Sequence, residues 1–313
     1  MKILVIHQVH EILENLLVKD GHLVDYILGM SRSQIIEKLP QYDGLVVRSA
    51  LKVDKEIMDA GSKLKFIARL GAGMEGIDSE YAATKNIILH NAPEGNRSAV
   101  GEQSVGMLLS LFNNLNKANS EVRKGIWHRE ANRGEEIQGK TVAIIGYGNM
   151  GSAFAEKISG FGARVIAYDK YKTGFGNKFV EEVDLKTIFN EADVVSLHTP
   201  LQHDTKHMVN ADFLSSFKKK ITLINTSRGP VVNTPDLVMS LKNGSVIGAC
   251  LDVIEYEGMS FEAVANADDK IVFDYLKQAD NVILTPHIAG WTHQSNERMA
   301  RVLAEKIIGV FEK

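Results

Sequence analysis

The chain has 313 residues, of which 44% are hydrophobic and 24% charged, and its formal net charge at pH 7 is -3. This composition is typical of a soluble globular protein that can hold two domains, and its weak acidity argues against nucleic acid or an anionic membrane as a partner. No apolar run approaches the roughly 20 residues of a membrane span, and a single cysteine, Cys250, fits a buried core position in a cytoplasmic protein without disulfides.

Short apolar runs alternate with helical stretches over the first 97 residues, as in parallel β/α units. We expect strands at residues 2–7, 45–47, 64–70 and 87–90. The second of these runs ends at Arg48 and Ser49, and the third ends in a turn rich in glycine, Gly71-Ala72-Gly73. Residues 1–97 are therefore predicted to form a small α/β domain of their own.

The next stretch, residues 96–119, reads as a largely apolar helix, which we expect to be buried between domains. Ser98 and Glu102 flank its start, and residues 125–139 are polar and read as a connection.

Residues 140–169 have the order strand, glycine turn, helix, strand and acid that binds a dinucleotide. The strands are expected at residues 141–145 and 164–168 and the helix at 152–159. The turn between them is Gly146-Tyr147-Gly148-Asn149-Met150-Gly151. Gly146 permits the tight turn, Gly148 lets the backbone approach a pyrophosphate, and Gly151 lets the helix pack close to the strand. Asp169 ends the second strand, where a carboxylate accepts from the ribose 2′-OH of NAD and repels a 2′-phosphate.

Further strands are expected at residues 194–198, 222–225, 247–252 and 282–284, followed by a closing amphipathic helix at residues 298–311. The simplest topology returns that helix to the first domain. We therefore predict two parallel-sheet α/β domains joined by two crossings. Residues 1–97 plus 289–313 form one domain and residues 98–288 the other, and the strand ends of both face a cleft.

Three charged residues follow strands of the second predicted domain: Arg228, Glu257 and His287. Arginine can clamp a carboxylate with two parallel hydrogen bonds. Histidine can exchange a proton near neutral pH, and a neighbouring carboxylate fixes its orientation. With a hydride carrier, these groups suit the interconversion of a 2-hydroxy acid and a 2-keto acid. No metal is required.

The segments NTSRGPVVN, LDVIEYE and LTPHIAG, spaced as they are after IIGYGNMG, resemble the D-isomer-specific 2-hydroxyacid dehydrogenases. The resemblance also covers VVRSALKVD, RLGAGMEGID and NAPEGNRSAVGEQ. It implies two Rossmann-like domains, with an NAD-binding domain inserted into a flavodoxin-like substrate domain, and dimerisation through the coenzyme domain. It also implies that His287 is the acid/base, that Glu257 pairs with it, and that Arg228 binds the substrate.

The same resemblance implies further binding residues. The backbone of Leu70, Gly71, Ala72 and Gly73 would hold the substrate carboxylate as an N–H nest. The nicotinamide side of the NAD site would be lined by Thr199, Pro200, Ser227, Asp252, His287 and Gly290.

The region around Arg48 and Ser49 looks most like the 3-phosphoglycerate dehydrogenases, the enzymes of serine biosynthesis, in which an arginine at this place contacts the substrate phosphate. The alternative within the family is a glyoxylate/hydroxypyruvate reductase, and a non-catalytic dinucleotide-sensing protein is the alternative of another class. Because the sequence stops at Lys313, we expect no C-terminal regulatory domain. Three features depart from the common pattern: Gly258, Trp291 and the long segment 259–277. We expect Trp291 either to cover the active site or to narrow it.

Overall fold

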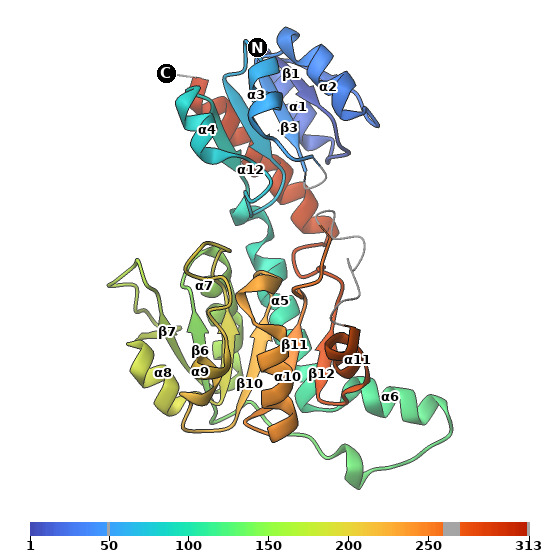
Figure 1. Cartoon of the computed structure of the whole chain (residues 1–313), viewed down its shortest axis with the longest axis vertical. Helices are drawn as coiled ribbons and strands as arrows, with labels where there is room; N and C mark the ends of the chain where they lie inside the picture. The colour runs from blue at the N-terminus through green and yellow to red at the C-terminus, as the bar shows by residue number, and fades with distance from the viewer. Residues whose placement is uncertain (49–50, 259–269, 312–313) are drawn as a thin grey trace. The chain divides into compact units, whose positions relative to one another are not determined.

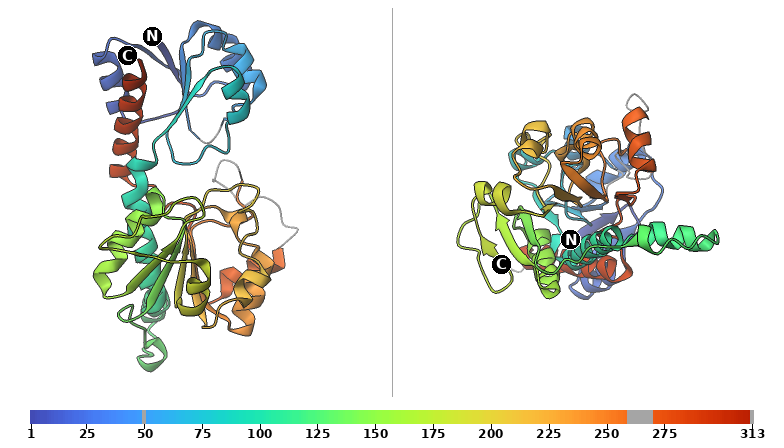
Figure 2. Two further views of the ribbon diagram at one scale, coloured as in Figure 1. Left: turned by 90° about the vertical axis from the view of Figure 1, so that its left-hand side faces the viewer. Right: turned by 90° about the horizontal axis from the view of Figure 1, so that it is seen from below.

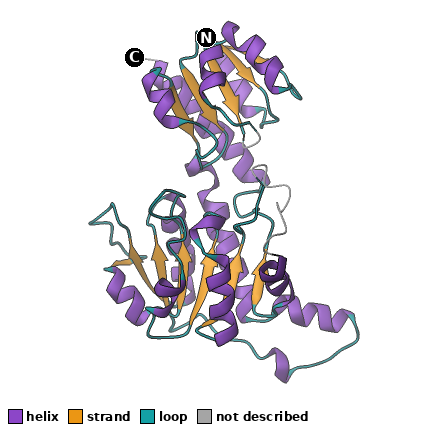
Figure 3. Ribbon diagram, in the orientation of Figure 1, coloured by secondary structure: helices purple, strands orange, loops and turns teal. Residues whose placement is uncertain are grey.

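The structure is a computed structural model that describes residues 1–48, 51–258 and 270–311. The chain divides into two compact units, Met1–Arg97 with Trp291–Lys313 (unit 1) and Ser98–Gly290 (unit 2). All the pairings between their named strands are parallel. Figure 3 shows helices flanking each sheet, so the predicted α/β class is confirmed.

Unit 1 contains a five-stranded sheet of order β2-β1-β3-β4-β5 (Figure 1). Its strands are β1 (Lys2–Val5), β2 (Leu23–Tyr26), β3 (Gly44–Val47), β4 (Phe66–Arg69) and β5 (Ile88–Asn91). Its helices are α1 (Ile12–Lys19), α2 (Arg32–Lys38), α3 (Lys55–Ala60), α4 (Ser79–Thr84) and α12 (His293–Phe311), with the 3-10 turn η1 (Leu39–Gln41).

The C-terminal helix α12 belongs to the core of unit 1, where it packs against α1. Leu13 and Leu17 of α1 share a buried cluster with Leu303 and Ile307 of α12. The helix begins at His293, five residues before the predicted start. That prediction was wrong because Thr292 and Ser295 cap the helix reciprocally. The Thr292 hydroxyl accepts from the Ser295 N–H, and the Ser295 hydroxyl accepts from the Thr292 N–H.

Unit 2 contains a seven-stranded sheet of order β12-β11-β10-β9-β6-β7-β8. Its strands are β6 (Thr141–Ile145), β7 (Arg164–Tyr168), β8 (Glu181–Glu182), β9 (Val194–Leu197), β10 (Ile221–Asn225), β11 (Val246–Leu251) and β12 (Val282–Leu284). Its helices are α6 (Leu115–Arg123), α7 (Asn149–Ile158), α8 (Leu185–Glu191), α9 (Ala211–Ser215), α10 (Thr234–Asn243) and α11 (Lys270–Gln278), with 3-10 turns η2 (Glu130–Asn132), η3 (Ser159–Phe161) and η4 (Gly229–Val231). Helix α5 (Pro93–Phe112) runs from unit 1 into unit 2.

The long apolar helix predicted over residues 96–119 is in fact two helices, α5 and α6. Asn114 separates them with a left-handed backbone (φ 51°), and a continuous helix cannot contain such a residue. Leu108 and Phe112 of α5 are buried in the core of unit 2 together with Cys250, whose thiol is inaccessible, as the sequence predicted. Among the described residues, no helix is both long and apolar enough to cross a membrane.

Candidate active site

The glycine turn of unit 2 follows β6, next to the point where the strand order reverses between β6 and β9. Gly146 has a left-handed backbone (φ 94°), and a Cβ there would lie 2.7 Å from the His198 carbonyl oxygen. A Cβ on Gly151 would lie 2.1 Å from the Gly146 carbonyl oxygen, so α7 approaches β6 only because residue 151 is glycine. Gly148 has open space around its Cα, where a ligand could approach the backbone.

Helix α7 starts directly after this turn, and its first intrahelical hydrogen bond joins the Ser152 N–H to the Gly148 carbonyl. The preceding N–H groups of Asn149, Met150 and Gly151 have no acceptor within the described chain. Free N–H groups and the positive end of a helix dipole suit a phosphate. The turn can therefore hold the pyrophosphate of a dinucleotide.

Asp169 lies at the carboxyl end of β7, beside the turn. One carboxylate oxygen accepts from the Tyr147 N–H (2.8 Å), and the other accepts from the N–H groups of Tyr171 (2.9 Å) and Lys172 (3.0 Å). The Lys172 Nζ donates to the Tyr147 carbonyl (3.3 Å). The carboxylate is thus fixed by the backbone at the position where a ribose hydroxyl would be recognised.

A buried polar pair follows β9. The His198 Nε2 lies 2.8 Å from the Ser196 hydroxyl, and burial lowers the pKa of His198 to about 3, so the ring is neutral at physiological pH. Among the described residues, neither the His198 Nδ1 nor the Thr199 hydroxyl has a hydrogen-bond partner. Pro200, the next residue, accepts from the Thr205 hydroxyl through its carbonyl (2.7 Å). The unpaired Thr199 hydroxyl is a polar group that a bound cofactor could satisfy.

His287 and Glu257 are in direct contact. The His287 Nδ1 lies 2.7 Å from the Glu257 Oε2, and the Glu257 Oε1 accepts from the Ile254 N–H (2.5 Å). His287 has a left-handed backbone (φ 54°), and its N–H donates to the Asp252 carbonyl (2.8 Å). The contact with Glu257 fixes the orientation of the His287 ring.

The Asp252 side chain fixes the loop that carries His287. It is 1% exposed and accepts from the Thr285 hydroxyl (2.5 Å) and from the N–H groups of Ile288 (2.9 Å) and Ala289 (2.9 Å). Gly290 directly follows this loop. Asp252 thus holds the backbone around His287 through three donors.

Arg228 follows β10, and its Nη1 donates to the Ser227 carbonyl (2.7 Å). Asn225 shapes this turn, because its amide donates to the Arg228 carbonyl (3.0 Å) and its oxygen accepts from the Ser227 hydroxyl (2.8 Å). A Cβ on Gly229 would lie 1.9 Å from the Ile254 carbonyl oxygen, so the Arg228 loop packs tightly on the loop that leads to Glu257. Sequence reasoning missed Asn225, although it ends a predicted strand.

In unit 1, the carbonyl groups of the turn after β4 all accept hydrogen bonds from neighbouring residues. The carbonyl of Gly71 accepts from the Ala92 N–H (2.9 Å), that of Ala72 from the Asn91 amide (2.7 Å), and that of Gly73 from the Arg69 guanidinium. The N–H groups of these three turn residues have no acceptor within the described chain, and that of Leu70 donates to the Val47 carbonyl (2.9 Å). The turn thus offers N–H groups to an anion, as a backbone nest does.

Arg48 follows β3 directly and is half-buried. Its guanidinium lies over the Trp291 ring, 4.4 Å from the ring centroid. Trp291 therefore packs on Arg48, a contact that the sequence did not predict. Ser49, predicted next to Arg48 as a substrate residue, and most of the segment 259–277 lie outside the described residues.

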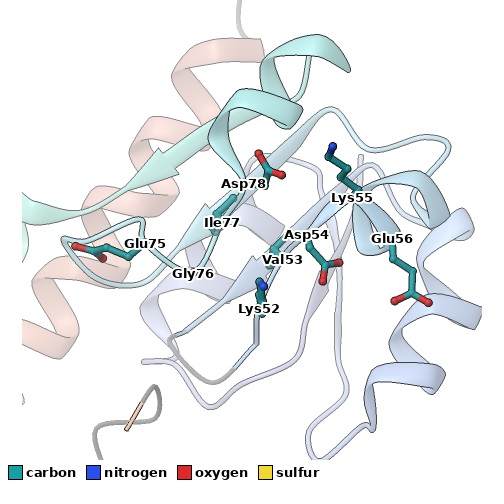
Figure 4. Close-up of a pocket in the computed structure, with 9 residues that line it drawn as sticks. All are labelled: Lys52, Val53, Asp54, Lys55, Glu56, Glu75, Gly76, Ile77 and Asp78. Carbon is teal, nitrogen blue, oxygen red and sulfur yellow. The ribbon is translucent and has the colours of Figure 1, made fainter. Parts of the chain in front are cut away.

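A hollow in unit 1 is lined by residues 52–56 and 75–78, which follow β3 and β4 (Figure 4). Its carboxylates Asp54 and Glu56 both accept from the Arg32 guanidinium, at 2.6 and 2.8 Å. The lining carries charges of both signs and none of the site residues predicted from the sequence. We assign it no ligand.

Comparison with known proteins gives one family. The family model described as D-isomer specific 2-hydroxyacid dehydrogenase, NAD binding domain, matches residues 105–289 of this chain. A hydroxypyruvate reductase of Thermotoga maritima is 36% identical over 278 residues, which cover 89% of this chain and 88% of the relative. A D-3-phosphoglycerate dehydrogenase of Synechocystis is 33% identical over 296 residues, and there the match covers 93% of this chain but only 51% of the relative. The solved D-lactate dehydrogenase from Aquifex aeolicus, complexed with NAD and lactic acid, has a TM-score of 0.82 at 27% identity, covering 100% of this chain and 94% of that one.

Proposed function

Because the chain belongs to the D-isomer specific 2-hydroxyacid dehydrogenases, which are NAD-dependent oxidoreductases acting on CH–OH groups, we propose that it interconverts 3-phosphoglycerate and 3-phosphohydroxypyruvate. The observation that carries the proposal of a working enzyme is the 2.7 Å contact between His287 and Glu257 in the unit that also holds the glycine turn. A protein that only senses a dinucleotide has no need of an oriented acid/base pair.

The cofactor site in this proposal uses residues of unit 2 only. The turn residues Gly146 to Gly151 cradle the pyrophosphate, and the Asp169 carboxylate accepts from the ribose 2′-OH. The nicotinamide side is lined by Thr199, Pro200, Ser227, Asp252, His287 and Gly290. Bound NADH supplies the hydride.

His287 protonates the keto oxygen during reduction and takes the proton back during oxidation. Glu257 fixes the orientation of the ring through its contact with the Nδ1 atom. The Arg228 guanidinium binds the substrate carboxylate and carbonyl, where its positive charge polarises the carbonyl. These three side chains come from loops after β10, β11 and β12, which are adjacent in the sheet.

We assign substrate binding to unit 1, which by this proposal is the substrate domain. Of the predicted nest Leu70 to Gly73, the N–H groups of Gly71, Ala72 and Gly73 hold the carboxylate, and the absence of an acceptor for them within the described chain supports this role. The Leu70 N–H is already donated to the Val47 carbonyl, so Leu70 supports the turn and does not bind the anion through its N–H. Arg48, with Ser49, binds the phosphate. A half-buried arginine at a strand end suits a second anionic group, which favours a phosphorylated acid and a role in serine biosynthesis.

The second candidate is a hydroxypyruvate or glyoxylate reductase. It is favoured by the relative from Thermotoga maritima, a hydroxypyruvate reductase that this chain matches over 88% of its length. In that case Arg48 would be a charge at the strand end without a substrate role.

We also propose a cytoplasmic homodimer that binds neither nucleic acid nor membrane. The net charge of -3 and the single, buried cysteine support the location and the absence of a polyanionic partner. Four apolar side chains support the dimer. Leu115, Val122, Ile126 and Trp127 are exposed on α6 and the loop after it, which extends away from the sheet of unit 2 (Figure 2).

The experiment that tests the catalytic proposal is His287→Ala. Because the imidazole moves the proton but does not hold the pyrophosphate, we expect NADH affinity to stay nearly intact. Turnover of 2-keto acids should fall at least about a hundredfold. Fluorescence titration of NADH and steady-state kinetics measure the two effects.

Glu257→Gln is the matched variant, since it keeps the shape and removes the charge. It should lower kcat by a smaller factor than His287→Ala. If His287→Ala retains full turnover, the proton donor is another group. If the unmodified protein binds NADH but reduces no 2-keto acid, the dinucleotide-sensing alternative is favoured.

A further inference from the structure

Two polar side chains lie at the point in unit 1 where ligands of open parallel sheets bind. The strand order β2-β1-β3-β4-β5 reverses between β1 and β3, so their carboxyl ends flank a switch point (Figure 1). Arg48 is the first residue after β3, and His7 is the second residue after β1. The His7 Nδ1 accepts from the Arg48 N–H (3.1 Å), so the two residues are in contact there.

Arg48 carries a positive charge that has no carboxylate partner among the described residues. Its Nη1 donates to the Gln8 carbonyl (3.1 Å), and burial lowers its pKa. A half-buried cation without a counter-ion is costly to the folded protein unless an anion completes it. The remaining guanidinium N–H groups are available for that anion.

His7 offers a second donor next to this cation. Its Nδ1 is an acceptor, so the neutral ring carries its proton on Nε2. Burial lowers the pKa of His7, and the neighbouring Arg48 charge lowers it further, which keeps the ring neutral at physiological pH. Nε2 has no acceptor within the described part of the chain, so its N–H can donate to a ligand.

Trp291 holds the Arg48 guanidinium in place. Its ring is 65% exposed, which is unusual for tryptophan, and the guanidinium carbon lies 4.4 Å from the ring centroid. Trp291 directly precedes Thr292, which caps the start of α12 together with Ser295. The position of the Trp291 backbone is therefore fixed by the helix end. An arginine stacked on an aromatic face loses little further freedom when it binds a ligand.

We propose that His7 donates a second hydrogen bond to the phosphate group bound at Arg48, and that Trp291 is a positioning residue that orients Arg48 in this site. The inference rests on the proposed function, because it names how the phosphorylated substrate is recognised. A phosphate monoester has three terminal oxygens, enough to accept from the guanidinium and from the His7 Nε2–H together.

The first test measures the ratio of kcat/KM for 3-phosphohydroxypyruvate to kcat/KM for hydroxypyruvate. Trp291→Leu should lower this ratio about tenfold, through the KM of the phosphorylated acid, because the lost contact between cation and ring is worth roughly 1–2 kcal/mol. Trp291→Phe keeps an aromatic face and should restore most of the ratio. A ratio that Trp291→Leu leaves unchanged would overturn the positioning role.

The second test concerns His7. Asparagine at this position can still accept from the Arg48 N–H but lacks the Nε2 donor, whereas glutamine offers a donor at nearly the Nε2 position. His7→Asn should therefore lower the same ratio, and His7→Gln should keep more of it. Equal ratios in the two variants and the unmodified protein would remove His7 from the phosphate site.

A third test detects phosphate binding at this site without measuring catalysis. The sequence has two tryptophans, so Trp127→Phe leaves Trp291 as the only one. Inorganic phosphate should change its emission saturably, and Arg48→Met, in the same background, should abolish the change. Emission that does not respond to phosphate would count against the site.

These tests separate the inference from the function on which it rests. If Arg48→Ala leaves the preference for the phosphorylated acid intact, Arg48 does not recognise the phosphate and the substrate proposal itself loses its support. If Arg48→Ala abolishes the preference but Trp291→Leu and His7→Asn do not, the function stands and the inference fails.

Discussion

The Asp169 carboxylate accepts from three backbone N–H groups and lies beside the glycine turn, with Lys172 close by. Asp169→Ala should weaken NADH binding about tenfold or more, since hydrogen bonds to charged groups contribute roughly 1.5–3 kcal/mol. It should also relax discrimination against NADPH. Without the carboxylate, the Lys172 ammonium is free to attract a 2′-phosphate. Dissociation constants for both coenzymes measure the effect.

Asp169→Asn is the control for this change, because it keeps an acceptor for the turn while it removes the charge that repels a 2′-phosphate. It should shift the coenzyme ratio with less loss of stability than Asp169→Ala. An unchanged ratio of NADPH to NADH affinity in both variants would remove Asp169 from the ribose site.

At the scale of residues, the sequence predicted which side chains stand at strand ends, but not what they contact. Its spacing indicated Arg228, Glu257 and His287, and the fold adds that the last two are 2.7 Å apart. The sequence did not indicate that Asn91 and Arg69 support the turn after β4. They do so by donating hydrogen bonds to carbonyl groups of that turn, and these partners are known only from the structure. Such partners are set by the tertiary fold and leave no local pattern.

The turn between β6 and α7 allows a matched pair of glycine variants. A Cβ at residue 151 would meet the Gly146 carbonyl oxygen at 2.1 Å, whereas one at residue 148 would meet nothing within 4 Å. Gly151→Ala should therefore destabilise the protein by about 2 kcal/mol, as overpacking does. Gly148→Ala should leave the stability nearly unchanged and weaken NADH binding, because its methyl group occupies the approach of the pyrophosphate.

Thermal unfolding and NADH titration of both variants check this pair. A Gly148→Ala variant that binds NADH normally would contradict the close approach of a ligand at that position. Equal melting temperatures for Gly151→Ala and the unmodified protein would show that α7 can move away from β6 at no cost.

At the scale of elements, the strands that contain buried residues were predicted, whereas β2 and β8, in which no residue is fully buried, were missed. The predicted bounds of β6, β7 and β12 agree with the structure. Strand β2 was missed, because Leu23 is 67% exposed and none of its residues is fully buried, so it shows no continuous apolar run. The break at Asn114 was missed because apolar residues continue on both sides of it.

At the scale of the whole molecule, the exposed apolar side chains of α6 and its following loop bear on the proposed dimer. Trp127→Asp or Ile126→Asp should convert a dimer into monomers, because a charge would have to be desolvated in the interface. Sedimentation equilibrium at micromolar concentration measures the mass. Lys124→Ala, on the same segment, is the control and should keep the dimer. A dimer that survives both aspartate substitutions would place the interface elsewhere.

Both parallel sheets could be predicted because most of their strands, β2 and β8 excepted, carry an apolar signal of their own and the β/α units repeat the same local pattern. The return of α12 to unit 1 could be predicted from the mid-chain position of the glycine turn. The substrate could not, because it depends on a few side chains such as His7, Arg48 and Trp291, whose contacts arise only when distant segments of the chain meet.

The most direct measurement is NADH oxidation by the purified chain with 3-phosphohydroxypyruvate, hydroxypyruvate, glyoxylate and 2-ketoisocaproate, compared by kcat/KM. We expect turnover with NADH in preference to NADPH and the highest kcat/KM for the phosphorylated acid. A higher kcat/KM for hydroxypyruvate or glyoxylate would make the protein a reductase of unphosphorylated acids. Absence of NADH oxidation with every 2-keto acid would contradict the account of an active dehydrogenase.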